Sequence, residues 1–290
     1  MQNKMVGLEP ECCGEATHRF RTPEPSYVDL VAHAWAAGNA PGNLWVDCAE
    51  RPTYAFLWDL GSCCYLAGDL TGPAVATELA SLVRRVLWPK ARIEHGLFLK
   101  VEAATPLDVS FISESFPGAS LRASDRVLLV SPPVPTDPGP EPGCDPPAPP
   151  ALPDPDAALR WVDRDLLRSE GLANHDRLLQ EIRCCWPSVD RFEQQGFGAS
   201  IVGGGELRAW CTGEYRTDQR IGIGIETVSE HQGKGYATAA ATAFLRRCHQ
   251  EGLTAYWDAW AANSASIRVA EKVGLRPVTR YQAYAGVLAP

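Results

Sequence analysis

The chain has 290 residues, of which 45% are hydrophobic and 21% are charged. This length suits two domains of about 130–150 residues, and the composition excludes a globally disordered chain. The net charge of −8 argues against nucleic acid or an anionic membrane as the main partner. We find no apolar run near the roughly 18–20 residues that cross a bilayer and no signal peptide, so we expect a cytoplasmic protein.

The N-terminal part, residues 1–130, shows an ordered series of strand and helix patterns. Period-two alternation indicates strands, and apolar residues at helical spacing indicate helices. These patterns predict strands at 44–48, 54–58, 63–67, 97–101 and 122–130, with helices at 74–87 and 106–115.

A proline-rich stretch follows, which we assign to a linker at 131–156. Half of the 24 prolines lie between Pro132 and Pro155. Such a segment lacks the backbone N–H donors that helices and sheets need, and it favours an extended conformation. It separates the first domain from a second at 157–290.

The second domain repeats the order of elements of the first. We predict strands at 198–202, 207–215, 220–228, 254–259 and 276–284, and helices at 174–186, 236–250 and 264–273. In both halves three strands precede a helix, a strand, a helix and a strand. This order predicts an α+β fold, built from two tandem units that arose by duplication.

The ten cysteines do not suggest a disulfide framework or a metal site. Six of them form three adjacent pairs, and neighbouring cysteines rarely bridge each other. The sequence has neither a CxxC nor an HExxH motif, which zinc sites of common types would need. We therefore expect free thiols and no metal.

The segment 220–252 carries the clearest chemical signal. Alternation places Ile221, Ile223 and Ile225 on one face of a strand, and it places Gly222, Gly224 and Glu226 on the other. The two glycines leave room for a ligand beside one carboxylate. A glycine-rich loop, His231-Gln232-Gly233-Lys234-Gly235, then enters a helix. Backbone N–H groups and a helix N-terminus together favour an anion such as a pyrophosphate.

This loop is neither of the common nucleotide loops. Lys234 is followed by glycine instead of the Ser or Thr of a Walker loop, and the glycine spacing differs from GxGxxG. These departures disfavour an ATP- or GTP-binding enzyme. The loop matches Gln-x-x-Gly-x-Ala, at Gln232, Gly235 and Ala237. It resembles the coenzyme A pyrophosphate loop of the GNAT acetyltransferases.

A second motif agrees with this resemblance. The run from Asn263 to Leu275 resembles the second GNAT signature, in which an Asn precedes a helix that ends at a Gly. Asn263 suits an N-cap, and Gly274 suits the left-handed position after the helix. The resemblance covers residues 158–284, and it implies a mixed, mostly antiparallel sheet flanked by helices.

The resemblance also implies acetyl-CoA as the acyl donor and an amine as the acceptor. In the family, the strand before the loop and the next strand splay apart, and pantetheine lies between them against the backbone at 226–228. The residues that the resemblance places at the cofactor are Thr227, Val228, Gln232, Gly233, Lys234, Gly235, Tyr236, Ala237, Asn263 and Ser266.

Acyl transfer to an alkylamine requires a group that removes a proton from the ammonium. Glu226 is our first candidate, because it projects from the cofactor strand, and Glu214 on the preceding strand is the second. Either carboxylate could instead form an ion pair with Arg216 or Arg220.

The sequence departs from the family at the residue that protonates the leaving thiolate. Many members carry a Tyr seven positions after the Asn, where this chain has Ala270. Tyr281 and Tyr284 are candidates for this role, with water as the alternative.

The sequence therefore predicts an N-acyltransferase that acts by direct attack of the amine in a ternary complex, and a non-catalytic acyl-CoA-binding module is the alternative. We expect the N-terminal unit to be a GNAT-like copy that has lost the cofactor. In the place of the phosphate loop it has Asp69, which repels phosphate, and Pro73, which removes an N–H donor.

Overall fold

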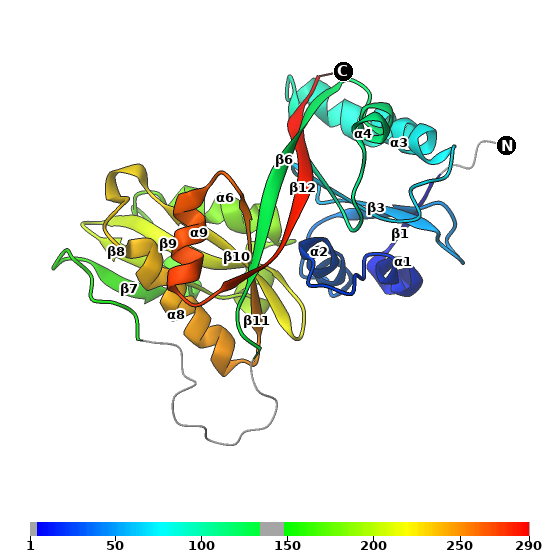
Figure 1. Ribbon diagram of the computed structural model, residues 1–290. Coiled ribbons are helices and arrows are strands. Elements are labelled where there is room, and N and C mark those ends of the chain that lie inside the picture. Colours follow the sequence, from blue (N-terminus) through cyan, green and yellow to red (C-terminus); the bar gives the residue numbers. More distant parts are fainter. Residues whose placement is uncertain (1–4, 134–147, 290) are drawn as a thin grey trace. The chain divides into compact units, whose positions relative to one another are not determined.

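The computed structural model describes residues 5–133 and 148–289. The chain forms two compact units (Figure 1). Unit 1 comprises Met1–Val127 and Thr279–Pro290, and unit 2 comprises Leu128–Val278. The central part of the predicted linker, 134–147, lies outside the described residues.

Unit 1 is a sheet with helices on both faces, α1 and α2 on one and α3 and α4 on the other (Figure 1). Its core gathers apolar side chains from the sheet and from α3, such as Phe56, Leu79 and Leu99. The elements are β1 (Val6–Leu8), η1 (Pro10–Cys12), α1 (Gly14–His18), α2 (Tyr27–Ala36), β2 (Asn43–Val46), β3 (Tyr54–Trp58), β4 (Cys63–Gly68), α3 (Val75–Ile93), β5 (Leu97–Ala103), α4 (Val109–Ser115) and most of β6 (Ala119–Val130) and β12 (Arg276–Leu288).

The strands β1 to β4 of unit 1 form an antiparallel meander. β4 then pairs in parallel with β5, from Cys63 opposite Lys100 to Leu66 opposite Ala103. β12 pairs with β5 in the antiparallel sense, with Tyr284 opposite Val101. The last strand of the chain thus completes the sheet of the first unit.

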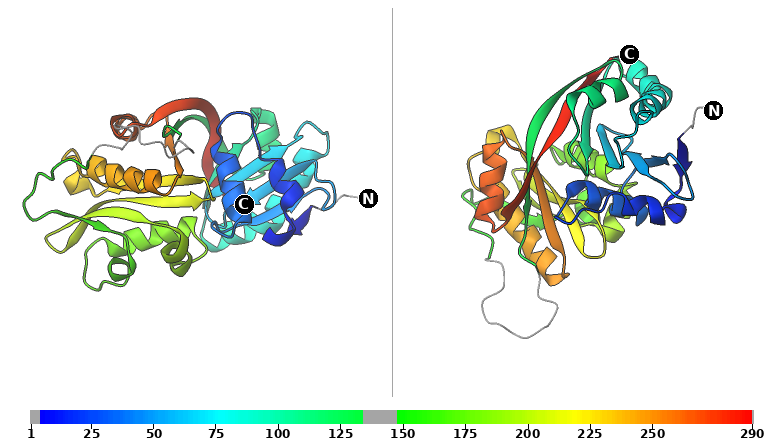
Figure 2. Two further views of the ribbon diagram at one scale, coloured as in Figure 1. Left: turned by 90° about the horizontal axis from the view of Figure 1, so that it is seen from below. Right: turned by 45° about the vertical axis from the view of Figure 1, so that its right-hand side comes forward.

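Unit 2 also places helices on both faces of its sheet. In the left view of Figure 2, α8 lies on one face, and the helices around α6 lie on the other. The elements are β7 (Ala158–Trp161), α5 (Arg164–Leu167), α6 (His175–Cys185), α7 (Val189–Gln195), β8 (Gly198–Gly203), β9 (Glu206–Arg216), β10 (Arg220–Thr227), η2 (Ser229–His231), α8 (Tyr236–Gln250), β11 (Thr254–Trp260) and α9 (Ser264–Lys272).

The sheet of unit 2 runs in the order β7-β8-β9-β10-β11. The first four strands are antiparallel, whereas β10 and β11 are parallel. Trp210 of β9 lies opposite Glu226, and Thr212 lies opposite Gly224. Opposite residues of a ladder share a face, so these four side-chain positions lie on the face that α6 covers.

The predicted α+β fold with two tandem units is confirmed. Most predicted elements are present within a few residues of their expected ends. The sequence patterns missed β1, η1, α1 and α2 in unit 1, and they missed η2, β7, α5 and α7 in unit 2. The last three of these are segments of four to seven residues, which are too short to show a clear period.

Two further observations concern residues 5–133 and 148–289. Their nine cysteines are all free thiols. No helix in these two ranges combines the length and the apolar character that a bilayer crossing needs.

Candidate functional site

The two parallel strands of unit 2 separate part-way along their length. β10 and β11 are paired from Arg220 opposite Thr254 to Gly222 opposite Tyr256. β10 continues to Thr227 and β11 to Trp260 beyond this ladder. A cavity of about 680 Å³ opens here, with Ile225, Thr227 and Trp257 in its wall.

The start of α8 closes one end of this cavity. Gly233 and Gly235 have φ angles of +76° and +86°, a left-handed backbone that favours glycine. Gly235 is the N-cap of α8, and no side chain caps this helix. The first N–H groups of a helix lack intrahelical partners. The loop therefore presents backbone donors and the positive end of the helix dipole to an anion.

Side chains from the loop and from α9 line the same cavity. The Gln232 amide donates to the carbonyl oxygen of Thr227 over 3.3 Å, which holds the loop against the end of β10. Asn263 caps α9 by accepting from the backbone N–H of Ser266 at 3.1 Å, as predicted. The Ser266 hydroxyl accepts from the indole N–H of Trp257 at 2.9 Å. The bonds of Asn263 and Ser266 fix the wall that α9 and β11 form.

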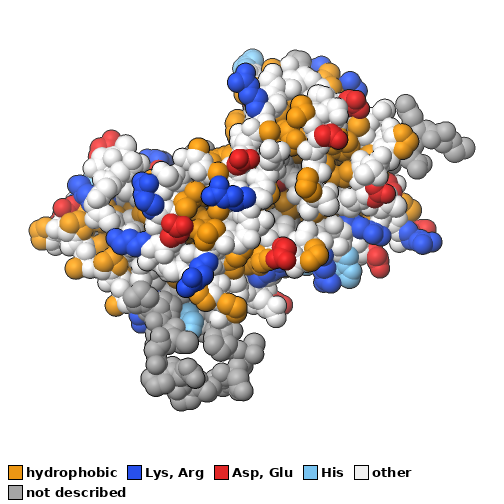
Figure 3. Space-filling view, viewed as in Figure 1, with side chains coloured by type: hydrophobic (Ala, Val, Ile, Leu, Met, Phe, Trp, Pro, Cys, Tyr) orange, Lys and Arg blue, Asp and Glu red, His pale blue; other side chains and the backbone are white. Residues whose placement is uncertain are grey.

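The same cavity has a basic border on α9. Arg268 and Lys272 are exposed, lie one helical turn apart and line the cavity. Several Lys and Arg side chains surround α9 in Figure 3, with acidic side chains between them. The border adds cationic groups to the N–H donors of the loop, and both kinds of group suit a ligand with several phosphates.

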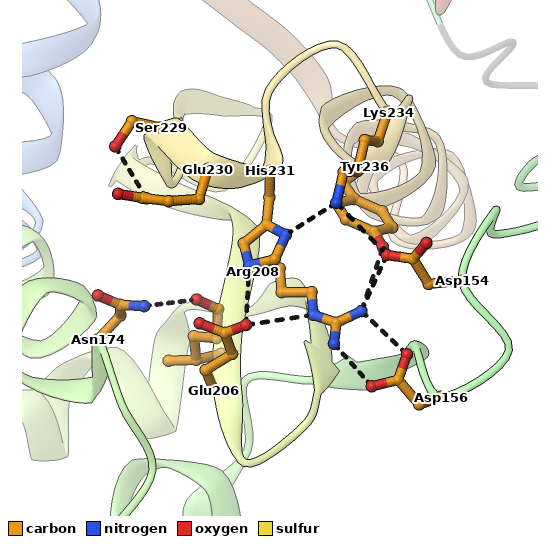
Figure 4. Close-up of polar contacts among 11 residues, drawn as sticks. Asp154, Asp156, Asn174, Glu206, Arg208, Ser229, Glu230, His231, Lys234 and Tyr236 are labelled. Atoms are coloured by element: carbon orange, nitrogen blue, oxygen red, sulfur yellow. Dashed lines mark hydrogen bonds and ion pairs between the residues drawn. The ribbon is translucent and has the colours of Figure 1, made fainter.

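A polar network fixes the start of α8 (Figure 4). Arg208 of β9 forms ion pairs with Asp154 at 3.2 Å and with Asp156 at 2.7 Å. Tyr236, the first residue of α8, donates its hydroxyl to Asp154, and this bond lowers the pKa of the Asp154 carboxyl. Lys234 Nζ lies 3.7 Å from the same carboxylate. The segment before β7 is thereby attached to the loop.

A second cavity, of about 450 Å³, lies between α6 and the strands β9 and β10. It shares Ile225 with the first cavity. Gly224 and Glu214 lie in its wall, together with Glu181 of α6. Burial raises the pKa of Glu181 to about 7, although the indole N–H of Trp210, which donates to Glu181 Oε2, favours the carboxylate.

Glu226 lies in the wall of the first cavity and forms an ion pair with Arg177 of α6, at 3.0 Å. The Arg177 guanidinium also stacks over the ring of Trp210, 5.8 Å from its centroid. The ion-pair partner of Glu226 is therefore Arg177 on α6, whereas Arg216 pairs with Glu251 at 2.9 Å.

Comparison with known proteins decides the family. Residues 153–284 match the family model of the GNAT acetyltransferases. These residues are a GNAT acetyltransferase domain. The family match confirms the resemblance drawn from the two motifs.

One curated relative and several solved structures are similar to the chain. The relative is the uncharacterized N-acetyltransferase YdfB of Bacillus subtilis (strain 168), 31% identical over 126 residues. The match covers 43% of this chain and 47% of the relative, so it spans about half of each protein.

The structural likeness extends over both units. A GCN5-related N-acetyltransferase-like protein from Streptococcus suis 89/1591 has a TM-score of 0.64 and 19% identity, over 96% of this chain and all of that one. A tandem GNAT protein from the clavulanic acid biosynthesis pathway has a TM-score of 0.52 and 15% identity, over 99% of each chain. At these identities the likeness is one of fold.

The GNAT domain brings most of the predicted site residues together. The predicted residues that line the larger cavity are Glu226, Thr227, Gln232, Gly233, Gly235, Tyr236, Ala237, Asn263 and Ser266. Val228 is buried in the hydrophobic cluster beneath them, and Lys234 is exposed beside Asp154. Glu214 lines the smaller cavity. All these roles remain predictions.

Tyr281 and Tyr284 lie outside the GNAT domain's compact unit. Both belong to unit 1, where the Tyr281 hydroxyl lies 3.3 Å from Glu102 Oε2 and Tyr284 donates to the carbonyl of Leu107. Ala270, at the family's Tyr position, is fully buried.

Sequence reasoning missed Glu181, Arg268 and Lys272. The last two follow Ser264 at spacings of four and eight residues, a periodicity that places them on one face of α9. Glu181 gives a weaker signal, an acidic residue beside the apolar stripe of α6.

Proposed function

We propose that the GNAT domain transfers an acetyl group from acetyl-CoA to the nitrogen of an amine. The observation that carries this proposal is the separation of β10 from β11 above an uncapped helix whose preceding loop contains two left-handed glycines. This arrangement provides an elongated space for a pantetheine arm and backbone donors for a pyrophosphate.

The residues present fit such a donor. The loop glycines leave open space where side chains would stand, since a Cβ on Gly233 or Gly235 meets no atom within 4 Å. Backbone N–H groups at the start of α8 would hold the pyrophosphate, and Arg268 and Lys272 would hold the remaining phosphate charge. The free edge of β10 would orient the pantetheine.

The acceptor would approach from the smaller cavity. The two cavities share Ile225 of β10, so an acyl group at this point of the strand would be reached from both. Holding the donor and the acceptor next to each other makes the attack effectively intramolecular, which lowers the entropic cost of the reaction. A leaving thiol has an ordinary pKa of about 8–9, so water can supply its proton without a Tyr at position 270.

The described part of unit 1 lacks the features that support donor binding in unit 2. β4 and β5 are paired from Cys63 to Leu66, and the backbone N–H of Ala104 continues the ladder to Leu66. In the following loop, Asp69 accepts hydrogen bonds from the N–H and the hydroxyl of Thr71. A carboxylate therefore occupies the place of the phosphate loop, and we propose one acetyl-CoA per chain.

The proposal is tested by titration calorimetry with acetyl-CoA, followed by a free-thiol release assay over a panel of amines. We expect a stoichiometry of one and amine-dependent release of thiol with formation of the amide. Binding without turnover across the panel would identify an acyl-CoA-binding module. A thermal shift with ATP but none with acetyl-CoA would overturn the proposal.

A further inference from the structure

The smaller cavity of unit 2 combines carboxylates with one neutralised cation. Glu181 projects into it from α6 and Glu214 from β9. Arg177 also lines the cavity, but its guanidinium is paired with Glu226 of β10 at 3.0 Å. The groups that line the cavity therefore carry a net negative charge when both glutamates are ionised.

Glu181 is held in one orientation at the wall of the cavity. Its Oε2 accepts from the indole N–H of Trp210, which is fully buried in the strand beneath. The neighbouring cluster of Leu178, Ile182 and Trp186 fixes the helix that carries it. A carboxylate that is oriented by a buried donor and faces a cavity is arranged to exchange a proton with a bound molecule.

The environment of Glu181 suits a proton acceptor. The charged and titratable groups that face it are Arg177, Cys184 and Cys185 of α6, Glu214 of β9 and Glu226 of β10. Burial and the two glutamates raise the pKa of Glu181 to about 7, and Trp210 and Arg177 oppose the rise. A general base is most effective when its pKa lies near the working pH.

We propose that this cavity binds a small cationic amine and that Glu181 takes the proton which the ammonium group loses before attack. The inference rests on the proposed acyl transfer. A volume of about 450 Å³ accommodates a small molecule. Glu214 provides the charge that attracts the ammonium form.

The proton balance of the reaction is complete with these groups. The ammonium gives one proton to the Glu181 carboxylate, and the free amine attacks the thioester carbonyl carbon. The C–N bond forms, the C–S bond breaks, and the second nitrogen proton passes to the leaving sulfur through water. The products are an amide and a thiol, and Glu181 then releases its proton to solvent.

The test compares the wild type with Glu181→Gln and with Asp176→Asn. The glutamine retains an oxygen that can accept the Trp210 N–H, so the fold should be preserved. Asp176 lies on the same helix and is exposed, which makes it a matched control. Each protein is titrated with acetyl-CoA, and kcat/KM for 1,4-diaminobutane is measured from pH 5.5 to 9.

We expect kcat/KM of the wild type to rise with pH through about 7, as Glu181 loses its proton. Glu181→Gln should lower kcat/KM at least about 100-fold and abolish this rise. Its affinity for acetyl-CoA should stay within about twofold of the wild type, because the donor binds in the other cavity. Asp176→Asn should behave like the wild type.

The preference for a cationic acceptor is tested with two amines of similar length that differ in charge. We expect 1,4-diaminobutane to exceed 4-aminobutyrate by at least about tenfold in kcat/KM, with a smaller preference in Glu214→Gln. This inference is overturned if kcat/KM of Glu181→Gln keeps the pH dependence of the wild type, or if the wild type prefers 4-aminobutyrate. Neither result would affect the proposed acetyl-CoA site. Failure of the wild type to bind acetyl-CoA overturns the proposed function itself.

Discussion

The Glu214 carboxylate occupies the space that a side chain at position 224 would need. A Cβ built on Gly224 would lie 2.8 Å from Glu214 Oε1 and 3.1 Å from its Cγ. Both residues line the smaller cavity, so the glycine allows the carboxylate to lie flat against β10. The position of an acidic group in the proposed acceptor site therefore depends on the absence of a side chain on the neighbouring strand.

Gly224→Ala should displace Glu214 and lower the catalytic efficiency with the amine acceptor. We expect kcat/KM for the amine to fall about tenfold, while the Kd for acetyl-CoA is unchanged. Steady-state kinetics in the Glu214→Ala background provide the control, since Gly224→Ala should then have little further effect. If Gly224→Ala lowers kcat/KM equally in the wild type and in Glu214→Ala, its effect does not depend on displacing Glu214.

Gly235→Ala should weaken acetyl-CoA binding in addition to lowering the stability of the fold. Gly235 has a φ of +86°, and Gly252 at the other end of α8 has a φ of +68°. Alanine at either position should cost about 1 kcal/mol, because both need a left-handed backbone. Only Gly235→Ala should also lower the affinity, by about tenfold in calorimetry. Equal affinities in the two variants would contradict the proposed phosphate loop.

Removing the basic border of α9 should reduce affinity for the phosphates of the donor. We expect the double variant Arg268→Ala, Lys272→Ala to bind coenzyme A about 3- to 10-fold more weakly, with a smaller dependence on salt. Pantetheine carries no phosphate and serves as the control ligand. A matching loss of pantetheine affinity would mean that the two side chains support the cavity instead of the phosphates.

Tyr236→Phe should destabilise the GNAT domain in a pH-dependent way. The Tyr236 hydroxyl lowers the pKa of the Asp154 carboxyl, so its contribution is present at neutral pH and is lost as Asp154 becomes protonated. We expect Tm to fall by about 2–4 °C at pH 7 and the difference to shrink below about pH 4. Calorimetric scans at both pH values check this, and a constant difference would contradict it.

The strand, loop and helix of 220–250 were predictable because their signals are local. Alternation of Ile221, Ile223 and Ile225 marks the strand, and the glycines mark the loop. Asn263 and Gly274 likewise mark the ends of α9 by local backbone requirements, and both are found there.

The smaller cavity of unit 2 was not predictable in the same way. The burial and orientation of Glu181 arise when α6 packs on Trp210, which lies 29 positions further along the chain. The place of Tyr281 depends on β12 joining the sheet of unit 1, and this pairing links residues nearly two hundred positions apart. Hydrophobic periodicity carries no information about such pairings.

Unit 1 contains a C-terminal segment that is synthesised after unit 2, which affects the order in which the two units fold. Leu128–Val278 contains all the residues of unit 2, whereas unit 1 needs Thr279–Pro290 as well. Domains generally fold in the order of their synthesis. Here unit 1 cannot complete its sheet until Thr279–Pro290 has been synthesised, and the edge of β5 is unprotected meanwhile, whereas unit 2 needs no residue beyond Val278 and can fold first.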